Sequence, residues 1–130
     1  MRRLWRWASS ISCASTASVR ARGWEGDFGS PSDPGEFKAL YAYSPVHNVR
    51  RGTRYPATLV ITGDHDARVF PMHSFKFAAA LQAAQAGPAP LLLAVDVASG
   101  HGGGETVKQA IAQSADMYAF LARNLAMQAE

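Results

Sequence analysis

The stretch YPATLVITGDHDAR, residues 55–68, joins a short apolar run directly to a cluster of charged residues. The apolar part, YPATLVIT (55–62), is rich in β-branched residues and lies between Pro56 and a glycine, which is typical of a strand buried on both faces. Two acids, a histidine and an arginine follow within GDHDAR (63–68). Charge placed directly after a buried strand indicates a polar site at the end of that strand.

A second strand of the same kind is predicted at LLLAVDV (91–97). The segment between the strands has a helical pattern over 71–86 and ends at AGPAP. Its apolar stripe consists of Phe77, Ala80, Leu81 and Ala84. Two buried strands joined by a helix are expected to lie parallel, with a right-handed crossover.

A short helix is predicted over 34–43, in PSDPGEFKALYAYSP. Asp33 is suited to cap this helix, Pro34 fits its first turn, and Glu36 is expected to reach back to the cap. Pro45 is expected to end it.

A last helix is predicted over 106–126, after the glycine-rich SGHGGG. Its apolar face consists of Val107, Ile111, Tyr118, Leu121 and Leu125. The element order is helix, strand, helix, strand, helix, which predicts an α/β fold with a parallel sheet.

The chain has 130 residues and a hydrophobic content of 48%, enough for one globular domain at most. Residues 1–24 hold five of the thirteen Lys and Arg residues and none of the ten acids. This leader shows neither helical nor strand periodicity, which favours a disordered or aberrant segment. An export or transit signal is the alternative, although the leader lacks the 7–15-residue apolar stretch of a signal peptide. No basic patch interleaved with aromatics occurs in the rest, so nucleic-acid binding is not expected.

A single cysteine, Cys13, excludes an internal disulfide, and no Cys/His spacing indicates a metal finger. Asp64, His65, Asp66 and His73 could hold a metal, but their spacing matches no known site, so none is predicted. No apolar run approaches the roughly 18–20 residues of a membrane-spanning helix. The sequence leaves the compartment open between cytoplasm and periplasm.

The charged loop after the first strand and SGHGGG after the second should emerge at the same edge of the sheet. An acid of the first loop can therefore meet His101 of the second. A carboxylate beside a histidine fixes the tautomer of the ring and stabilises its protonated form, as a Ser-His-Asp site requires. Each of these residues could instead have a purely structural role. His101 could be structural, Asp64 and Asp66 could be turn or capping acids, and Arg68 could be a surface residue.

In α/β hydrolases the triad follows the chain order Ser, Asp or Glu, His. Asp66 and His101 fit the last two places. The first place is empty, because the sequence contains no GxSxG motif.

The amino-acid sequences of three stretches resemble those of one family. LYAYSPVHNV, YPATLVITGDHDARVFPMHSFKFAAALQ and GHGGG with ADMYAFLARNL are similar to the carboxyl-terminal part of prolyl oligopeptidases. These are serine endopeptidases of the α/β-hydrolase class that cleave after proline in short peptides, without metal or organic cofactor. The likeness covers about residues 26–126 and implies a partial α/β-hydrolase fold, the carboxyl-terminal βαβα portion of a parallel sheet.

Carried over position by position, the resemblance implies catalytic roles for Asp66 as the triad acid and His101 as the triad base. It also implies that Arg68 binds a substrate carbonyl and that Val69 lines the proline pocket. The departures are Ala67, where the family has a second Asp, and Glu105 to Val107, where it has KPT. Neither departure removes a triad member.

The resemblance implies two segments, a disordered or out-of-frame leader over 1–25 and the carboxyl-terminal part of a peptidase S9 catalytic domain over 26–130. Codons can be chosen for residues 8–19 such that removal of two nucleotides gives the translation VVDILRFHRFG. This translation resembles the family segment just upstream, which suggests the hypothesis that the leader is family sequence read out of frame. Without the nucleophilic serine, the isolated chain is expected to be inactive.

Two alternatives stay open. The chain could be a noncatalytic interaction fragment that associates with another chain, or with itself, through exposed sheet edges. It could also come from a related esterase or dipeptidyl peptidase of the same fold. The motifs DHDARV and YSPVHNV disfavour this second alternative.

Overall fold

The computed structural model describes residues 5–6, 25–101 and 106–126. Its sheet is parallel throughout and has the order β1-β2-β3. The strands are β1 (Trp5–Arg6), β2 (Thr58–Gly63) and β3 (Leu91–Asp96). The α/β class and the parallel pairing predicted from the sequence are therefore confirmed.

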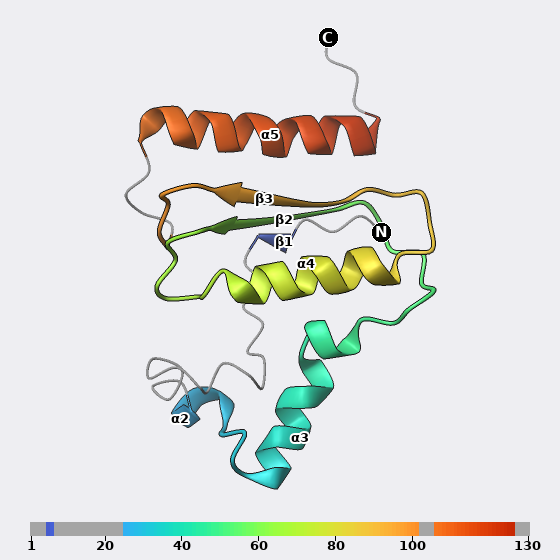
Figure 1. The fold of residues 1–130 in the computed structure, drawn as a ribbon, viewed down its shortest axis with the longest axis vertical. Helices are drawn as coiled ribbons and strands as arrows, with labels where there is room; N and C mark the ends of the chain where they lie inside the picture. The colour runs from blue at the N-terminus through green and yellow to red at the C-terminus, as the bar shows by residue number, and fades with distance from the viewer. Residues whose placement is uncertain (1–4, 7–24, 102–105, 127–130) are drawn as a thin grey trace.

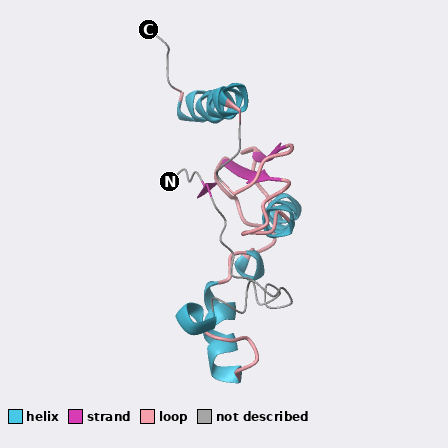
Figure 2. Cartoon of the chain, turned by 90° about the vertical axis from the view of Figure 1, so that its left-hand side faces the viewer, coloured by secondary structure: helices cyan, strands magenta, loops and turns pink. Residues whose placement is uncertain are grey.

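Helices lie on both sides of this sheet. They are α2 (Glu25–Phe28), α3 (Pro34–Tyr43), a 3₁₀ turn η2 (Val46–Asn48), α4 (Met72–Ala84) and α5 (Val107–Leu125). In Figures 1 and 2, α4 and α5 lie on opposite sides of the strands, and α3 lies beyond α4. Each predicted strand and helix is present with ends shifted by a few residues at most, whereas η2 and α2 were not predicted.

The core forms where α4 packs against β2. Val60 is 1% exposed and contacts a buried cluster of Phe77, Ala78 and Leu81 on α4. The half-buried side chains that surround it are Val46, Val49, Tyr55, Leu91 and Leu93. The predicted α4 stripe is thus largely confirmed, since Phe77, Leu81 and Ala84 are buried and Ala80 is half-buried.

The start of α3 follows the predicted capping chemistry with one difference. Asp33 Oδ1 accepts hydrogen bonds from the backbone N–H groups of Gly35 and Glu36, at 2.8 and 2.9 Å. The Glu36 carboxylate does not return to the cap residue; it accepts from Ser30 N at 2.6 Å. The prediction that Glu36 closes a capping box is therefore wrong, because the backbone turns back at Ser30 and brings an earlier N–H group within reach.

The second strand and the last helix are much less buried than the sequence predicts. No residue of β3 is fully buried, and Leu92 and Val95 are 48% and 38% exposed. On α5, Ile111 and Tyr118 of the apolar stripe are each 64% exposed. The prediction that β3 is buried on both faces is wrong, because β3 is an edge strand and no described element packs closely over its outer side.

Polar contacts connect α5 to the end of β3. The Gln113 side chain donates to Asp96 Oδ2, and Gln109 Nε2 donates to the carbonyl of Val97 at 3.4 Å. The helix begins with a complete capping box between Thr106 and Gln109. Local capping therefore sets the start of α5, although its apolar stripe lies exposed.

The amino-terminal leader contains one described element that was not expected. Trp5 and Arg6 form β1, paired with Val60 and Ile61 of β2. On the side away from β3, β2 would present unpaired backbone groups without β1, and such an edge pairs readily with an extended segment. The rest of the predicted leader over 1–25 lies outside the described residues, apart from Glu25 at the start of α2.

The α4–β2 core predicts a clear contrast between two leucines. Leu81→Ala should lower the free energy of unfolding by about 2 kcal/mol or more, because Leu81 is 5% exposed in the core. Leu125→Ala, at a position 44% exposed on α5, should change it by less than about 0.5 kcal/mol. Urea unfolding followed by circular dichroism measures both, and equal losses would contradict the assignment of the core.

Candidate active site

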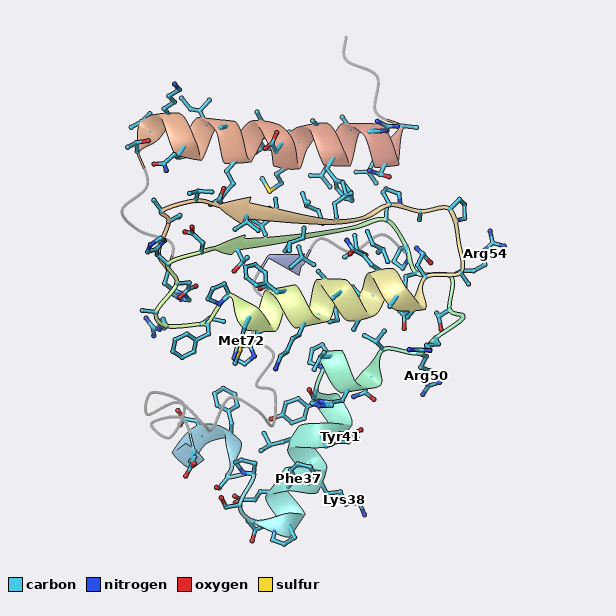
Figure 3. All side chains as sticks on the ribbon, in the orientation of Figure 1. Phe37, Lys38, Tyr41, Arg50, Arg54 and Met72 are labelled. Carbon is cyan, nitrogen blue, oxygen red and sulfur yellow. The ribbon has the colours of Figure 1, made fainter. Side chains whose placement is uncertain are left out.

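The register of β2 and β3 places two loops side by side. Gly63, the last residue of β2, pairs with Asp96, the last residue of β3. The next backbone N–H group, that of Asp64, donates to the Asp96 carbonyl at 3.1 Å. In Figure 3 these strand ends lie on the same side of the molecule as Met72, which begins α4. Arg50 and Arg54 lie at the opposite end.

Asp66 and His101 meet between these loops, although 35 positions separate them in the sequence. Asp66 Oδ2 and His101 Nδ1 are within hydrogen-bond distance, 2.8 Å apart. The side chains are 12% and 20% exposed, so solvent reaches the pair only in part. The contact predicted from parallel strand ends is present in the structure.

The second carboxylate oxygen of Asp66 is also occupied. Oδ1 accepts hydrogen bonds from the backbone N–H groups of Arg68 and Val69, at 2.9 and 2.8 Å. Burial raises the pKa of the Asp66 carboxyl, but the hydrogen bonds that it accepts outweigh burial and hold the pKa below its usual value. An ionised carboxylate only accepts hydrogen bonds, so His101 must carry its proton on Nδ1.

In this tautomer Nε2 of His101 is the acceptor nitrogen of a neutral ring. A nitrogen in that state can take a proton from a hydroxyl group, and the nearby carboxylate then stabilises the positive charge that forms on the ring. The Asp66–His101 arrangement therefore suits a general base with its orienting acid.

Arg68 and Val69 lie two and three positions after Asp66 in the same loop. The structure places Arg68 at the surface and Val69 half-buried. Their backbone groups orient Asp66, as described above. The carbonyl-binding role of Arg68 and the pocket-lining role of Val69 stay predictions.

The other acid of the loop has a different histidine partner. Asp64 Oδ1 lies 2.6 Å from Nδ1 of His65, the next residue, whose side chain is 71% exposed. Hydrogen bonding from His65 is the main cause that lowers the pKa of Asp64. Sequence reasoning left Asp64 and Asp66 open as partners of His101, and the structure pairs Asp66 with that ring.

A serine–histidine contact occurs elsewhere, at the end of α3. Ser44 Oγ lies 2.8 Å from His47 Nδ1. Ser44 is 0% exposed, so its hydroxyl is closed to a substrate. It ends the helix instead, since its backbone N–H donates to the Tyr41 carbonyl. This pair therefore does not replace the missing GxSxG nucleophile.

The described residues contain neither a cluster of metal ligands nor a helix that could cross a membrane. No three or more His, Cys, Asp or Glu side chains are grouped to hold a metal ion in the described ranges. Within the same ranges, no helix has both the length and the apolar character needed to cross a membrane.

The close approach of Gly63 to Ser99 in this site was not predicted from the sequence. A Cβ atom built on Gly63 would lie 2.4 Å from the Ser99 carbonyl oxygen, and Ser99 itself is 1% exposed. A glycine at the end of an apolar strand, directly before a charged loop, is the signal that could have indicated such an approach.

The family model described as the prolyl oligopeptidase family matches residues 8–128. A prolyl endopeptidase of Elizabethkingia meningoseptica is 50% identical over 99 residues, which is 75% of this chain and 14% of that protein. Prolyl oligopeptidase A of Amanita bisporigera is 42% identical over 107 residues, 82% of this chain and 14% of that protein. The chain thus spans about 14% of the length of these curated relatives.

Solved structures give the same likeness in three dimensions. A prolyl endopeptidase structure matches with a TM-score of 0.79 and 46% identity, covering 83% of this chain and 16% of the other. Prolyl oligopeptidase B of Galerina marginata, bound to a 25-residue macrocyclisation substrate, matches with a TM-score of 0.83 and 37% identity. That match covers 93% of this chain and 17% of the other.

The lowered pKa of Asp66 predicts a pH-dependent stability. A carboxyl whose folded pKa lies below its unfolded value of about 3.9 stabilises the fold fully above that pH, and this stabilisation is lost as the pH falls through the folded pKa. Asp66→Asn should therefore lower the free energy of unfolding by about 1–3 kcal/mol at pH 7. The difference from the wild type should shrink below about pH 3.9.

Urea unfolding at a series of pH values from neutral to acidic measures this difference. Asp116→Asn on the exposed surface of α5 is the matched control, since it removes a carboxylate without removing the contact to His101. A wild-type advantage over Asp66→Asn that stays constant down to strongly acidic pH would contradict the prediction.

Proposed function

The chain belongs to the prolyl oligopeptidase family of serine peptidases, and from this premise we propose that it supplies the acid and the base of a Ser-His-Asp triad. The proposed reaction is hydrolysis of the peptide bond after proline in short peptides. In this proposal Asp66 is the acid and His101 is the base. The observation that carries it is the 2.8 Å contact between Asp66 Oδ2 and His101 Nδ1 at the shared end of two parallel strands.

The proposed steps follow from the tautomer of His101. The Nε2 atom takes the proton of a serine hydroxyl as that oxygen attacks the substrate carbonyl, and the ring then gives the proton to the leaving amine. Asp66 keeps the ring oriented and stabilises the imidazolium between these two steps. A water molecule then attacks the acyl group in place of the serine, with His101 again as the base, and releases the acyl group.

Arg68 and Val69 are proposed to bind the substrate beside this base. A guanidinium group donates hydrogen bonds to a peptide carbonyl, and an apolar side chain suits the ring of proline. Both residues lie in the loop that holds Asp66, so a substrate on them would lie close to His101.

The nucleophile must come from outside this sequence, since the chain contains no GxSxG motif. The chain also spans about 14% of the length of its relatives. We therefore propose that the triad is completed by family sequence that corresponds to a segment upstream of this one, and that the isolated chain is inactive.

A chimera tests this proposal directly. Residues 26–126 would replace the matching segment of the Elizabethkingia meningoseptica prolyl endopeptidase, which is 50% identical. The chimera should cleave a prolyl peptide substrate and react with a serine-directed fluorophosphonate probe, whereas the isolated chain should do neither. Asp66→Asn in the chimera should lower turnover by about 10⁴-fold, as expected for a complete triad.

Asp116→Asn is again the matched control and should leave turnover of the chimera unchanged, because Asp116 lies on the surface of α5. A folded chimera without prolyl-peptide hydrolysis would contradict the proposed reaction. Unchanged turnover of the Asp66→Asn chimera would show that another residue is the acid. Cleavage of an ester or a dipeptidyl substrate alone would favour the related hydrolases of this fold.

A second candidate function is self-association of the chain, favoured by its exposed apolar surface. The outer strand β3 exposes Val97 just beyond its end, at 70%. The residues Val107, Ile111, Tyr118 and Leu125 recur every four or seven positions on α5 and are 44–77% exposed. An edge strand beside such a stripe can pair with the same elements of a second copy.

Analytical ultracentrifugation tests this second candidate. The chain should form dimers or larger species, and Ile111→Lys should weaken their association by about tenfold or more, the loss expected from placing a charge in an apolar contact. Asp116→Lys lies on the opposite side of α5 by helical periodicity and should leave association unchanged. A monomeric chain at every concentration, or equal effects of the two variants, would exclude association through this stripe.

A further inference from the structure

We propose that Asp64 is a positioning residue that holds the His101 loop in place for its contact with Asp66. This inference rests on the proposed function, in which the Asp66–His101 pair acts as acid and base. It assigns a different task to each acid of the GDHDAR loop. Asp66 orients the ring, and Asp64 fixes the backbone that carries the ring.

The first support is the network of hydrogen bonds between the two loops. The backbone N–H of His65 donates to the Ser99 carbonyl at 3.0 Å. In the opposite direction, the backbone N–H of Ser99 donates to Asp64 Oδ1 at 3.4 Å. Residues 64 and 65 therefore engage both backbone groups of Ser99, which lies two positions before His101.

The second support is the close packing at Gly63. The Ser99 carbonyl oxygen would lie 2.4 Å from a Cβ atom at this position, so any larger residue would push the two loops apart. Ser99 is 1% exposed, so its backbone groups have little access to water. The Asp64 carboxylate replaces water as the acceptor for this buried N–H group.

The third support is the backbone conformation of the loop. Ala98 has a φ of 59°, in the left-handed region that residues with a side chain rarely adopt. A residue in that region persists when surrounding contacts enforce it. Asp64 accepts from the backbone on the carboxyl side of Ala98, and hydrogen bonds from Ala98 and Ser99 also contribute to the lowered pKa of Asp64.

His65 is a second hydrogen-bond partner of the Asp64 oxygen that accepts from Ser99. Its Nδ1 lies 2.6 Å from Asp64 Oδ1, and this hydrogen bond is the largest cause of the lowered pKa of Asp64. The Asp64 carboxyl is ionised at neutral pH, as an ordinary Asp with a pKa of about 3.9 also is. An ionised acceptor forms the stronger hydrogen bond with a backbone N–H. The exposed ring of His65 supports the contact between the loops without belonging to the Asp66–His101 pair.

The tautomer of His101 reports whether Asp64 has this role. With its loop in place, the ring donates from Nδ1 to Asp66 and populates one tautomer; without a fixed partner, it populates both. The experiment uses the 130-residue chain with ¹⁵N-labelled histidine and records long-range ¹H–¹⁵N spectra at neutral pH. His101→Gln identifies the signals of His101 among the four histidines.

Asp64→Ala should convert the single Nδ1–H pattern of His101 into a mixture of tautomers. It should also accelerate hydrogen exchange of the Ser99 amide by about tenfold or more, as loss of a hydrogen bond to a charged acceptor entails. Asp64→Asn keeps an acceptor oxygen at the same place, so it should restore part of the wild-type pattern. His65→Gln removes only the outer partner and should have the smallest effect.

Protected backbone amides of β2 and β3 in the same samples report whether each variant is folded. If Asp64→Ala loses this protection, the comparison rests on Asp64→Asn, whose Nδ1–H population should fall below the wild-type value. A wild-type tautomer pattern in the folded Asp64 variants would overturn the positioning role.

Asp66→Asn separates this inference from the proposed function. It should abolish the single-tautomer pattern of His101 whether or not Asp64 has a positioning role, because it removes the charged acceptor at Nδ1. If Asp66→Asn leaves the pattern intact, the proposed acid–base pair fails. If only the Asp64 variants leave it intact, the pair stands and the positioning role of Asp64 fails.

Discussion

The parallel pairing of β2 with β3 is the constraint on which the rest of the structure depends. Six residue pairs, from Thr58 with Leu91 to Gly63 with Asp96, fix the register. Successive side chains of a strand alternate between the two faces, so a slip by one residue would turn the buried Val60 away from α4. The same slip would move the loop of Asp66 relative to the loop of His101. One register therefore determines both the core and the candidate site.

Burial is unevenly distributed around this pairing. α4 contributes six buried residues and β2, which packs against it, contributes three, whereas β3 and α5 leave large apolar side chains exposed. The contacts of α5 to the end of β3 include hydrogen bonds from Gln109 and Gln113. The amount of apolar surface on these two elements suits a larger domain than the described residues form, consistent with a chain that spans about 14% of the length of its relatives.

The sequence predicted the elements well because their signals are local. Asp33 and Pro34 mark the start of α3, and the β-branched run before Gly63 marks β2. The burial of β3 was not predictable in this way, because an apolar run is the same whether a neighbouring layer covers it or not. The pairing of β1 was not predicted for a similar reason, since it depends on the edge of β2 that β3 leaves unpaired. Likewise, the contact of Asp66 with His101 follows from strand order, whereas the approach of Ser99 to Gly63 requires coordinates.

The two carboxylates that follow β2, Asp64 and Asp66, have separate hydrogen-bond partners. Asp64 and Asp66 are two positions apart, and two like charges at that spacing would disfavour each other without donors of their own. Each carboxylate has such donors: Asp64 has the His65 ring and the Ser99 amide, and Asp66 has two backbone amides and the His101 ring. Separate donors let both acids stay ionised side by side. One charge can then hold the imidazole while the other holds the loop that carries it.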